Sequence, residues 1–246
     1  MGPQDLVKFQ WVRTQLQIVH KGQMLFRAGT PLDALYVVRS GTIKARLTGS
    51  DGGEQISGFY LPGEVVGLDG IENRQYASTA EALETCSVCV FPFAALMGMA
   101  RTLDGLQSQL WHHASHEIAV RQRLLMTIGR RGAEGRVAEF LLSVSGRFER
   151  FGYSGTRFRL PMSRQDIADY VGLSVETVCR VLTRFQDAGI IQRDQREITI
   201  NRADELSKLS AGASECPPKY DLDPARPGAP PRSPADERHL QALAAG

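Results

Sequence analysis

Short apolar segments alternate with glycine-containing turns from about residue 20 to residue 94 of the chain. The apolar segments are residues 24–26, 35–38, 43–47, 55–60, 65–66 and 87–91. The turns between them are Ala28-Gly29, Ser40-Gly41, Asp51-Gly52-Gly53 and Pro62-Gly63. Even spacing of this kind predicts antiparallel strands that form a barrel, sandwich or roll. Residues 5–19, which precede them, are weakly amphipathic and predict a helix.

From Leu103 onward the apolar positions recur every three or four residues, which is the period of a helix. The recurring positions are Leu106, Leu110, Ala114, Ile118, Arg121, Leu125 and Ile128. They predict one helix with a seam about seven turns long on one face, and Arg121 is the one charge in it. Such a seam is typical of helices that pair. We therefore predict a dimer seam made by Leu110, Ile118, Arg121, Leu125 and Ile128.

Residues 161–200 carry the signals of two short helices that are joined by a tight turn. Ser163 is typical of a helix N-cap, and Gly172 is typical of the end of that helix. Ser174 caps a second helix, which is followed by two β-type segments around a polar turn. This order predicts a winged helix-turn-helix. An amphipathic helix over residues 136–151 is expected before it.

The second of these helices has a polar face that is available to a partner. The side chains on that face are Glu176, Thr177, Cys179, Arg180, Thr183 and Arg184. Arginine can donate two hydrogen bonds to guanine and glutamate can accept one from cytosine, and each such pair discriminates between bases by about 1–3 kcal/mol. We predict base contacts from Glu176, Cys179 and Arg180. We predict contacts to the DNA backbone from Arg164, Ser174, Thr177 and Arg184.

The composition favours a soluble protein with apolar cores of ordinary size, rather than a small disulfide-rich protein or a membrane protein. Of the 246 residues 42% are hydrophobic, and no apolar run approaches 18 residues, so a cytoplasmic location is expected. The net charge of +2 is uninformative, but residues 130–200 hold twelve arginines, no lysine and nine acidic residues. Arginine is the better residue for phosphate and base recognition.

Enzyme chemistry has little support in the sequence. No grouping of the Ser/His/Asp type is present, so we predict that the protein is not an enzyme. His112, His113 and His116 form a helical cluster that could imitate a zinc site, but no acidic residue lies in the intervening turn. A small-molecule-binding module whose winged helix contacts another protein is an alternative from a different class.

The predicted fold class is α+β, with four parts. Residues 1–102 form a β-roll sensor domain, 103–130 the dimerisation helix, and 131–210 the winged helix-turn-helix domain. Residues 211–246 form a disordered tail, because seven of the chain's twelve prolines fall in residues 217–234.

This arrangement resembles the Crp/Fnr family of bacterial transcription regulators. The strings KGQMLFRAGTPLDALYVVRSGTIKARL, GEQISGFYLPGEVVGLDGI, ALETCSVCVFPF and SVETVCRVLTRFQDAGII are similar to the FNR branch, the oxygen-responsive regulators of anaerobic metabolism. The resemblance spans residues 20–210. It implies a homodimer that binds an inverted repeat and acts as an activator of anaerobic or redox-responsive genes.

The resemblance also implies roles for single residues. Glu176 and Arg180 would read bases in the major groove. Val175 stands where the cyclic-AMP receptor branch has arginine, which favours half-sites similar to TTGAT. Cys179 stands where the FNR branch has serine, so the preference at one outer base is open. The turn at Asp51, Gly52 and Gly53 would contact RNA polymerase.

Three interpretations compete for the signal that the roll senses. The first is a cyclic nucleotide or another small molecule, as in Crp-type regulators. Gly63-Glu64 matches the turn that such a site needs, but Tyr76 falls where the phosphate-binding arginine would be. Arg74 is the remaining candidate for that arginine, and cyclic AMP is not the ligand we expect.

The second interpretation is a [4Fe–4S] cluster, which the FNR branch ligates with three upstream cysteines and one that matches Cys89. No cysteine precedes Cys86, so either the ligands are absent or the sequence starts late. Cys86 and Cys89 would face opposite sides of a strand and do not make a site by themselves. The third interpretation is a regulator without a ligand, in which Arg121 tunes the dimer. Alternatively, Arg121 turns aside to pair with Glu117.

Overall fold

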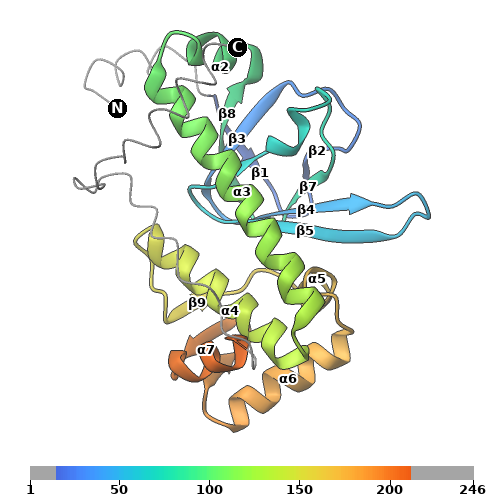
Figure 1. The fold of residues 1–246 in the computed structure, drawn as a ribbon, viewed down its shortest axis with the longest axis vertical. Coiled ribbons are helices and arrows are strands. Elements are labelled where there is room, and N and C mark those ends of the chain that lie inside the picture. Colours follow the sequence, from blue (N-terminus) through green and yellow to red (C-terminus); the bar gives the residue numbers. More distant parts are fainter. Residues whose placement is uncertain (1–14, 212–246) are drawn as a thin grey trace, which may run out of the picture. The chain divides into compact units, whose positions relative to one another are not determined.

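The structure, a computed structural model, describes residues 15–211 (Figure 1). The N-terminal part is a roll of two four-stranded antiparallel sheets. One sheet has the order β1 (Gln15–Val19), β8 (Cys86–Pro92), β3 (Ala34–Ser40) and β6 (Val65–Val66). The other has the order β2 (Met24–Phe26), β7 (Thr79–Ala82), β4 (Ile43–Thr48) and β5 (Glu54–Tyr60). All of the predicted strands are present, which confirms the roll.

The prediction of a helix over 5–19 is wrong for residues 15–19, which form strand β1. This strand pairs with β8 from Gln15 opposite Val90 to Val19 opposite Cys86, and Val19 is buried in the roll. The ladder to β8 supplies backbone hydrogen bonds that outweigh a weak helical pattern. Residues 1–14 of that predicted helix lie outside the described residues.

Three elements of the roll were not predicted. They are strand β7, the short 3-10 helix η1 (Leu68–Gly70) and helix α2 (Phe93–Ala100). Strand β7 carries the pattern Thr-Ala-Glu-Ala, in which Ala80 and Ala82 fill the core. Alanine is depleted in strands, and its small side chain gives only a weak apolar signal.

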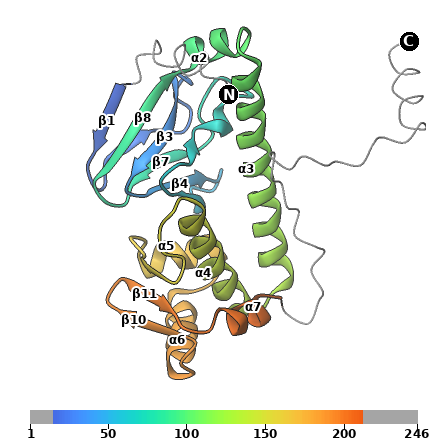
Figure 2. The same ribbon diagram turned by 90° about the vertical axis from the view of Figure 1, so that its left-hand side faces the viewer.

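Helix α3 (Asp104–Arg130) runs from the roll to the C-terminal elements, as predicted (Figures 1 and 2). Leu106 is buried in the core of the roll and Leu110 packs against it. The helix ends where Arg131 and Gly132 adopt extended backbone, and α4 (Ala133–Arg150) begins directly after them. None of the described helices is long and apolar enough to cross a membrane.

The winged helix-turn-helix follows the predicted order. It consists of β9 (Arg157–Arg159), α5 (Arg164–Val171), α6 (Val175–Asp187), β10 (Ile191–Asp194) and β11 (Glu197–Ile200). Ser163 accepts from the backbone of Asp166 in a capping box, and Gly172 ends α5 in the left-handed conformation at φ 65°. Ser174 caps α6 by accepting from the backbone N–H of Thr177.

A single apolar core holds this domain together. Leu141 of α4, Ile167 of α5, Leu182 of α6 and Ile198 of β11 are all at most 1% exposed. Helix α7 (Ala203–Ala211), which was not predicted, buries Leu206 in the same core. Because α4 and α6 share this core, the position of α4 sets that of the predicted recognition helix. The predicted tail from 212 onward lies outside the described residues.

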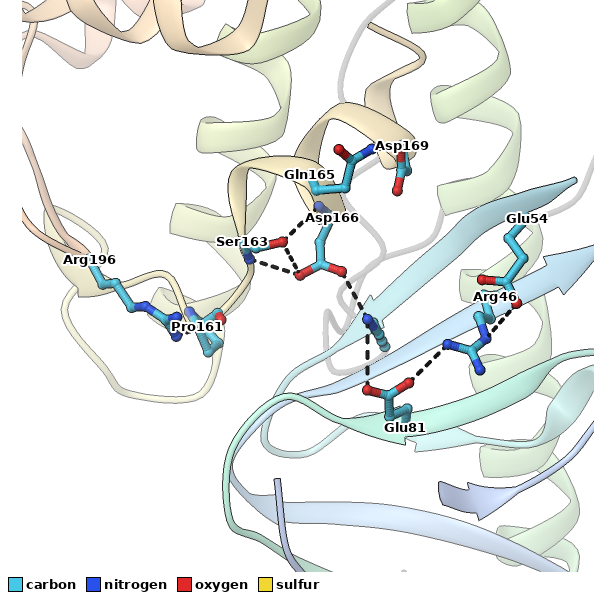
Figure 3. Close-up of polar contacts among 10 residues, drawn as sticks. Arg46, Glu54, Glu81, Pro161, Ser163, Gln165, Asp166, Asp169 and Arg196 are labelled. Atoms are coloured by element: carbon cyan, nitrogen blue, oxygen red, sulfur yellow. Dashed lines mark hydrogen bonds and ion pairs between the residues drawn. The ribbon is translucent and has the colours of Figure 1, made fainter. Parts of the chain in front are cut away.

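A chain of ion pairs connects the roll to the first helix of the helix-turn-helix (Figure 3). Lys44 Nζ of β4 lies 2.9 Å from Asp166 Oδ1, at the N-terminal turn of α5. On the same sheet Lys44 also lies 3.8 Å from Glu81, which pairs with Arg46 at 3.0 Å. Burial raises the pKa of Asp166, but hydrogen bonds from Ser163 and Lys44 outweigh it and hold this pKa below its ordinary value.

We expect Lys44→Met to destabilise the protein at pH 7 by about 1–3 kcal/mol, because it leaves a buried carboxylate without its charged partner. Since the pKa of Asp166 is lowered in the folded state, its contribution is present above the ordinary aspartate pKa near 4 and is lost as the pH falls through the folded pKa. The difference between variant and parent should therefore shrink below about pH 4.

Chemical denaturation at several pH values measures this difference. The matched control is Lys208→Met, whose pair with Asp204 is 3.8 Å long and exposed, and which should change stability by less than about 0.5 kcal/mol. An equal loss in the two variants would contradict the prediction.

Candidate nucleic-acid interface

Helix α6 buries one face and exposes the other. Val178, Val181, Leu182 and Phe185 are at most 3% exposed and pack into the domain core. The opposite face exposes Glu176, Arg180, Thr183 and Arg184, with Cys179 half-buried beside them. Figure 2 shows α6 and the β10–β11 hairpin at the end of α3 that is remote from α2. No part of the roll covers this face within the described residues.

The N-terminal turn of α6 orients the predicted base-contacting side chains. Arg180 NH2 donates to Thr177 Oγ1 at 3.2 Å, and this hydroxyl lies 3.0 Å from that of Ser174. Hydrogen bonds from the backbone N–H of Glu176 and from the Ser174 hydroxyl lower the pKa of Glu176. Glu176 is therefore ionised at neutral pH and can only accept hydrogen bonds, while Arg180 can only donate.

Arginines from α5 and the wing lie next to this helix. Arg193 of β10 donates to Gln186 at 2.7 Å and to Thr183 at 3.3 Å, which ties the wing to α6. Partial burial lowers the pKa of Arg164, and the nearby charge of Arg193 lowers it further. The predicted backbone contact Arg164 thus belongs to a positive region together with the wing.

A concavity of about 620 Å³ lies between the end of α3, the start of α4 and α6. Arg130, Arg131, Arg180 and Arg184 line it together with Glu134. The guanidinium of Arg184 is paired with the carboxylate of Glu134, although Arg184 remains 60% exposed. Three of the predicted DNA contacts on α6, Thr177, Arg180 and Arg184, thus face a positive hollow that contains one acidic side chain.

The outer face of α3 carries three large apolar side chains spaced seven residues apart. Trp111, Ile118 and Leu125 are 66%, 59% and 71% exposed, and we call them the apolar stripe. Sequence inspection identified Ile118 and Leu125 but missed Trp111, which its spacing of seven from Ile118 would have revealed. Of the other predicted seam residues, Leu110 packs against the roll and Ile128 is half-buried.

Arg121 turns toward the roll instead of the outer face. Its guanidinium donates to Glu117 Oε1 at 2.6 Å, to the hydroxyl of Tyr60 at 3.1 Å and to the carbonyl of Ser57 at 2.5 Å. Of the two interpretations of this residue, the pairing with Glu117 is the one that the geometry shows. An effect of Arg121 on the dimer stays a prediction.

Comparison with known proteins identifies this arrangement. Residues 135–209 match the Crp-like helix-turn-helix domain family, and residues 16–102 match the cyclic nucleotide-binding domain family. The chain is 43% identical over 195 residues to the transcriptional activator protein anr of Pseudomonas aeruginosa, covering 79% of this chain and 80% of that one. The chain belongs to the Crp/Fnr family. The predicted family and its FNR branch are thereby confirmed.

Two further relatives support the assignment of the chain to the Crp/Fnr regulators. The fumarate and nitrate reduction regulatory protein of Yersinia pestis is 42% identical over 192 residues, which cover 78% of this chain and 77% of that one. The structure of FixK2 from Bradyrhizobium japonicum has a TM-score of 0.74 at 30% identity and covers 82% of this chain and 99% of that one. The protein is a transcription regulator with a DNA-binding domain, in a family that is not an enzyme family.

The interior of the roll in this Crp/Fnr regulator is filled by its own side chains. The Tyr76 ring stacks on Phe26 at 3.7 Å between centroids, and its hydroxyl donates to the carbonyl of Ala34 at 2.7 Å. Arg74, the candidate phosphate ligand, instead lies over the ring of Phe93 at 4.8 Å. The position at which the phosphate-binding arginine was expected is therefore held by a tyrosine that packs inside the roll.

The cysteines described in this Crp/Fnr regulator do not fit a cluster with four thiolate ligands. Cys86 is buried and its thiol donates to the carbonyls of Thr42 and Glu84, whereas Cys89 is half-buried on the other side of β8. Cys179 lies in α6. Within residues 15–211 no group of three or more histidine, cysteine or acidic side chains is arranged to hold a metal ion.

Proposed function

We propose that the protein binds an inverted repeat of FNR-type half-sites, similar to TTGAT, as a homodimer. The observation that carries this proposal is the exposed polar face of α6, on which Thr177 holds the guanidinium of Arg180. Arg180 donates to a guanine in the major groove and Glu176 accepts from a cytosine. Cys179, a weak donor and acceptor, lies beside them and relaxes the preference at one base.

Backbone contacts position this helix. Arg164, Ser174, Thr177 and Arg184 surround the base-contacting face, and cations and helix N-termini bind phosphate without reading sequence. The apolar stripe on α3 pairs with its copy around a twofold axis. The two copies of α6 then lie in successive major grooves, about 34 Å apart.

The proposed contact with RNA polymerase is the turn between β4 and β5. Asp51, Gly52 and Gly53 are exposed, and Asp51 Oδ1 accepts from the backbone N–H of Gly53 at 2.9 Å, which fixes the shape of the turn. A relative bears the name transcriptional activator, and activation through this turn is in keeping with that name.

The signal of this protein differs from that of a cyclic-nucleotide sensor because Tyr76 occupies the roll. Ligation of a [4Fe–4S] cluster through Cys89 needs three further thiolates, which the described residues do not supply. From its membership of the FNR branch, we propose that the protein is a redox-responsive activator that works in the cytoplasm as a homodimer.

The proposal is tested by binding of the full chain to a duplex that contains two TTGAT-type half-sites as an inverted repeat. Competition with a scrambled duplex of equal length should show at least about a thousandfold preference. Equal affinity for the two duplexes would refute sequence-specific binding. Equal affinity for the repeat and a TGTGA-type repeat would refute the assignment of the half-site.

We expect Glu134→Gln to strengthen DNA binding about three- to tenfold, because it releases Arg184 to contact phosphate in both copies. One more phosphate contact per copy makes the slope of log K against log salt steeper by about 1.8 per dimer. Fluorescence anisotropy at several salt concentrations measures both quantities. Glu72→Gln, an exposed substitution in the roll with the same change in charge, should alter neither. A parallel gain in both variants would contradict this role of Glu134.

A further inference from the structure

The Gly63-Glu64 turn of the roll is occupied by an arginine of the DNA-binding domain. Arg147 Nε of α4 donates to Glu64 Oε1 at 2.7 Å, and Arg147 NH2 donates to Glu64 Oε2. The same Oε2 accepts from the backbone N–H of Leu61 at 2.9 Å. Both oxygens of the carboxylate that a ligand of the roll would meet are therefore already used by the chain itself.

This ion pair lies at a buried junction. The side chains of Arg147 and Glu64 are 10% and 15% exposed, and Arg147 also donates to the carbonyl of Phe59. Burial by itself lowers the pKa of Arg147, but the carboxylate of Glu64 outweighs it and raises this pKa overall. A charged arginine with two parallel hydrogen bonds to one carboxylate has a fixed direction as well as a fixed distance.

The turn is shaped to receive the end of α4. Gly63 has φ 88°, and a Cβ atom at this position would overlap the ring of Phe151, which directly follows α4. On the other side the turn is tied to β3, since Gly63 N donates to the carbonyl of Val38 at 2.7 Å. Arg147 and Phe151 thus contact a turn that cannot easily move within the roll.

Apolar contacts bring the two domains together but do not fix their angle. Phe59 of the roll lies 6.1 Å from Phe140 of α4 and 5.2 Å from Tyr170 of α5, between ring centroids. Ring pairs of this type prefer certain arrangements but gain only about 0.5–1.5 kcal/mol from them, so related packings cost little. The two hydrogen bonds between Arg147 and Glu64 are directional, and together with the Lys44–Asp166 pair they select one of these packings.

We propose that Arg147 is a positioning residue for DNA recognition, which replaces an external ligand at the Gly-Glu turn and sets the angle between the recognition helix and the dimerisation helix. The chain of contacts is short. Glu64 belongs to the roll, the roll holds α3 through Leu106 and Arg121, and α4 carries α6 in a common core. The docked arrangement leaves Arg180 and Glu176 exposed, so it does not block DNA binding.

The inference rests on the proposed function, because an angle between two recognition helices matters only for a repeat that both helices read. A single half-site needs one helix and is insensitive to that angle. Loss of positioning should therefore weaken binding to the inverted repeat and leave binding to a half-site unchanged. If Arg147 only stabilised the fold, its loss would lower the fraction of folded protein and so weaken binding to both duplexes by the same factor.

The test compares Arg147→Met, Glu64→Gln and the double variant with the parent, on the inverted repeat and on a single half-site. If only about a tenth of the variant molecules keep the docked arrangement that binds the repeat, each single variant binds the repeat about tenfold more weakly than the parent. The double variant should be no weaker than the single ones, because all three remove the same pair. Arg147→Lys keeps the charge but loses the fork, and should resemble Arg147→Met.

The matched control is Glu84→Gln, which breaks the exposed pair of Arg159 and Glu84 at 3.6 Å and should leave both affinities unchanged. Parent-like affinity of Arg147→Lys and Glu64→Gln for the repeat would overturn the proposal, and so would an equal loss on the half-site. If the parent itself does not prefer the repeat to a scrambled duplex, the proposed function fails first. Addition of cyclic AMP should change none of these affinities, and a restored affinity in Glu64→Gln would also count against the proposal.

Discussion

Replacing Arg180 with alanine is expected to abolish the preference for the inverted repeat and to leave weak, salt-sensitive binding. The guanidinium is the donor that Thr177 holds at the exposed face of α6. A fork to guanine is worth about 1–3 kcal/mol, and a dimer loses two of them, so about 2–6 kcal/mol of discrimination disappears. The remaining affinity comes from phosphate contacts, which do not depend on sequence.

Competition between the repeat and a scrambled duplex measures this loss. Arg202→Ala removes the same charge from an arginine that precedes α7 and pairs with Glu205, and should keep the preference of the parent. If Arg180→Ala still prefers the repeat as strongly as the parent does, Arg180 is not the residue that reads the guanine.

Replacing Leu125 with glutamate is expected to convert the dimer to monomers and, as a result, to abolish binding to the repeat. Leu125 is 71% exposed in the single chain, which is costly for so large an apolar side chain unless a partner covers it. Burial of a leucine contributes about 1.5–3 kcal/mol, and a twofold interface contains it twice, so dimerisation should weaken by about two to four orders of magnitude. The new charges would also repel each other across the axis.

Sedimentation velocity at several concentrations measures the dimer, and binding to the repeat measures its consequence. Ile71→Glu, at a 39% exposed position of the roll, is the matched control and should stay dimeric. A dimer of unchanged strength in Leu125→Glu would place the interface elsewhere on the molecule.

Local signals made most of the DNA-binding domain predictable. The N-caps Ser163 and Ser174 and the left-handed Gly172 act within a few residues, so their effect can be read from the sequence alone. The polar face of α6 was predictable because the apolar residues of this helix recur at helical spacing, which leaves the remaining positions on the opposite face. The prediction for residues 15–19 was wrong because the partner of that strand, β8, lies about seventy residues further along the chain.

The contacts that connect the domains were not predictable in the same way. Arg147 and Glu64 are 83 positions apart, and Lys44 and Asp166 are 122 apart. Neither pair can be recognised from the spacing of its residues in the sequence, because each forms only when the two folded domains pack together. Glu64 was instead interpreted as part of a possible ligand-binding turn, and Arg147 was given no role within the helix predicted over residues 136–151. Arg121 was predicted on the dimer seam from its helical spacing alone. The direction of its side chain depends on Tyr60 and Ser57, which only the folded roll brings near.

The apolar stripe of α3 has a genetic consequence. If the stripe forms the dimer interface, a subunit that has lost Arg180 of α6 still pairs with an intact one, because Trp111, Ile118 and Leu125 belong to α3. If subunits combine at random in a cell that makes equal amounts of both, only about a quarter of the dimers carry two functional recognition helices. Alleles that lose Arg180 should therefore be dominant over the intact allele. Alleles that lose the apolar stripe should be recessive, because their products do not pair with intact subunits.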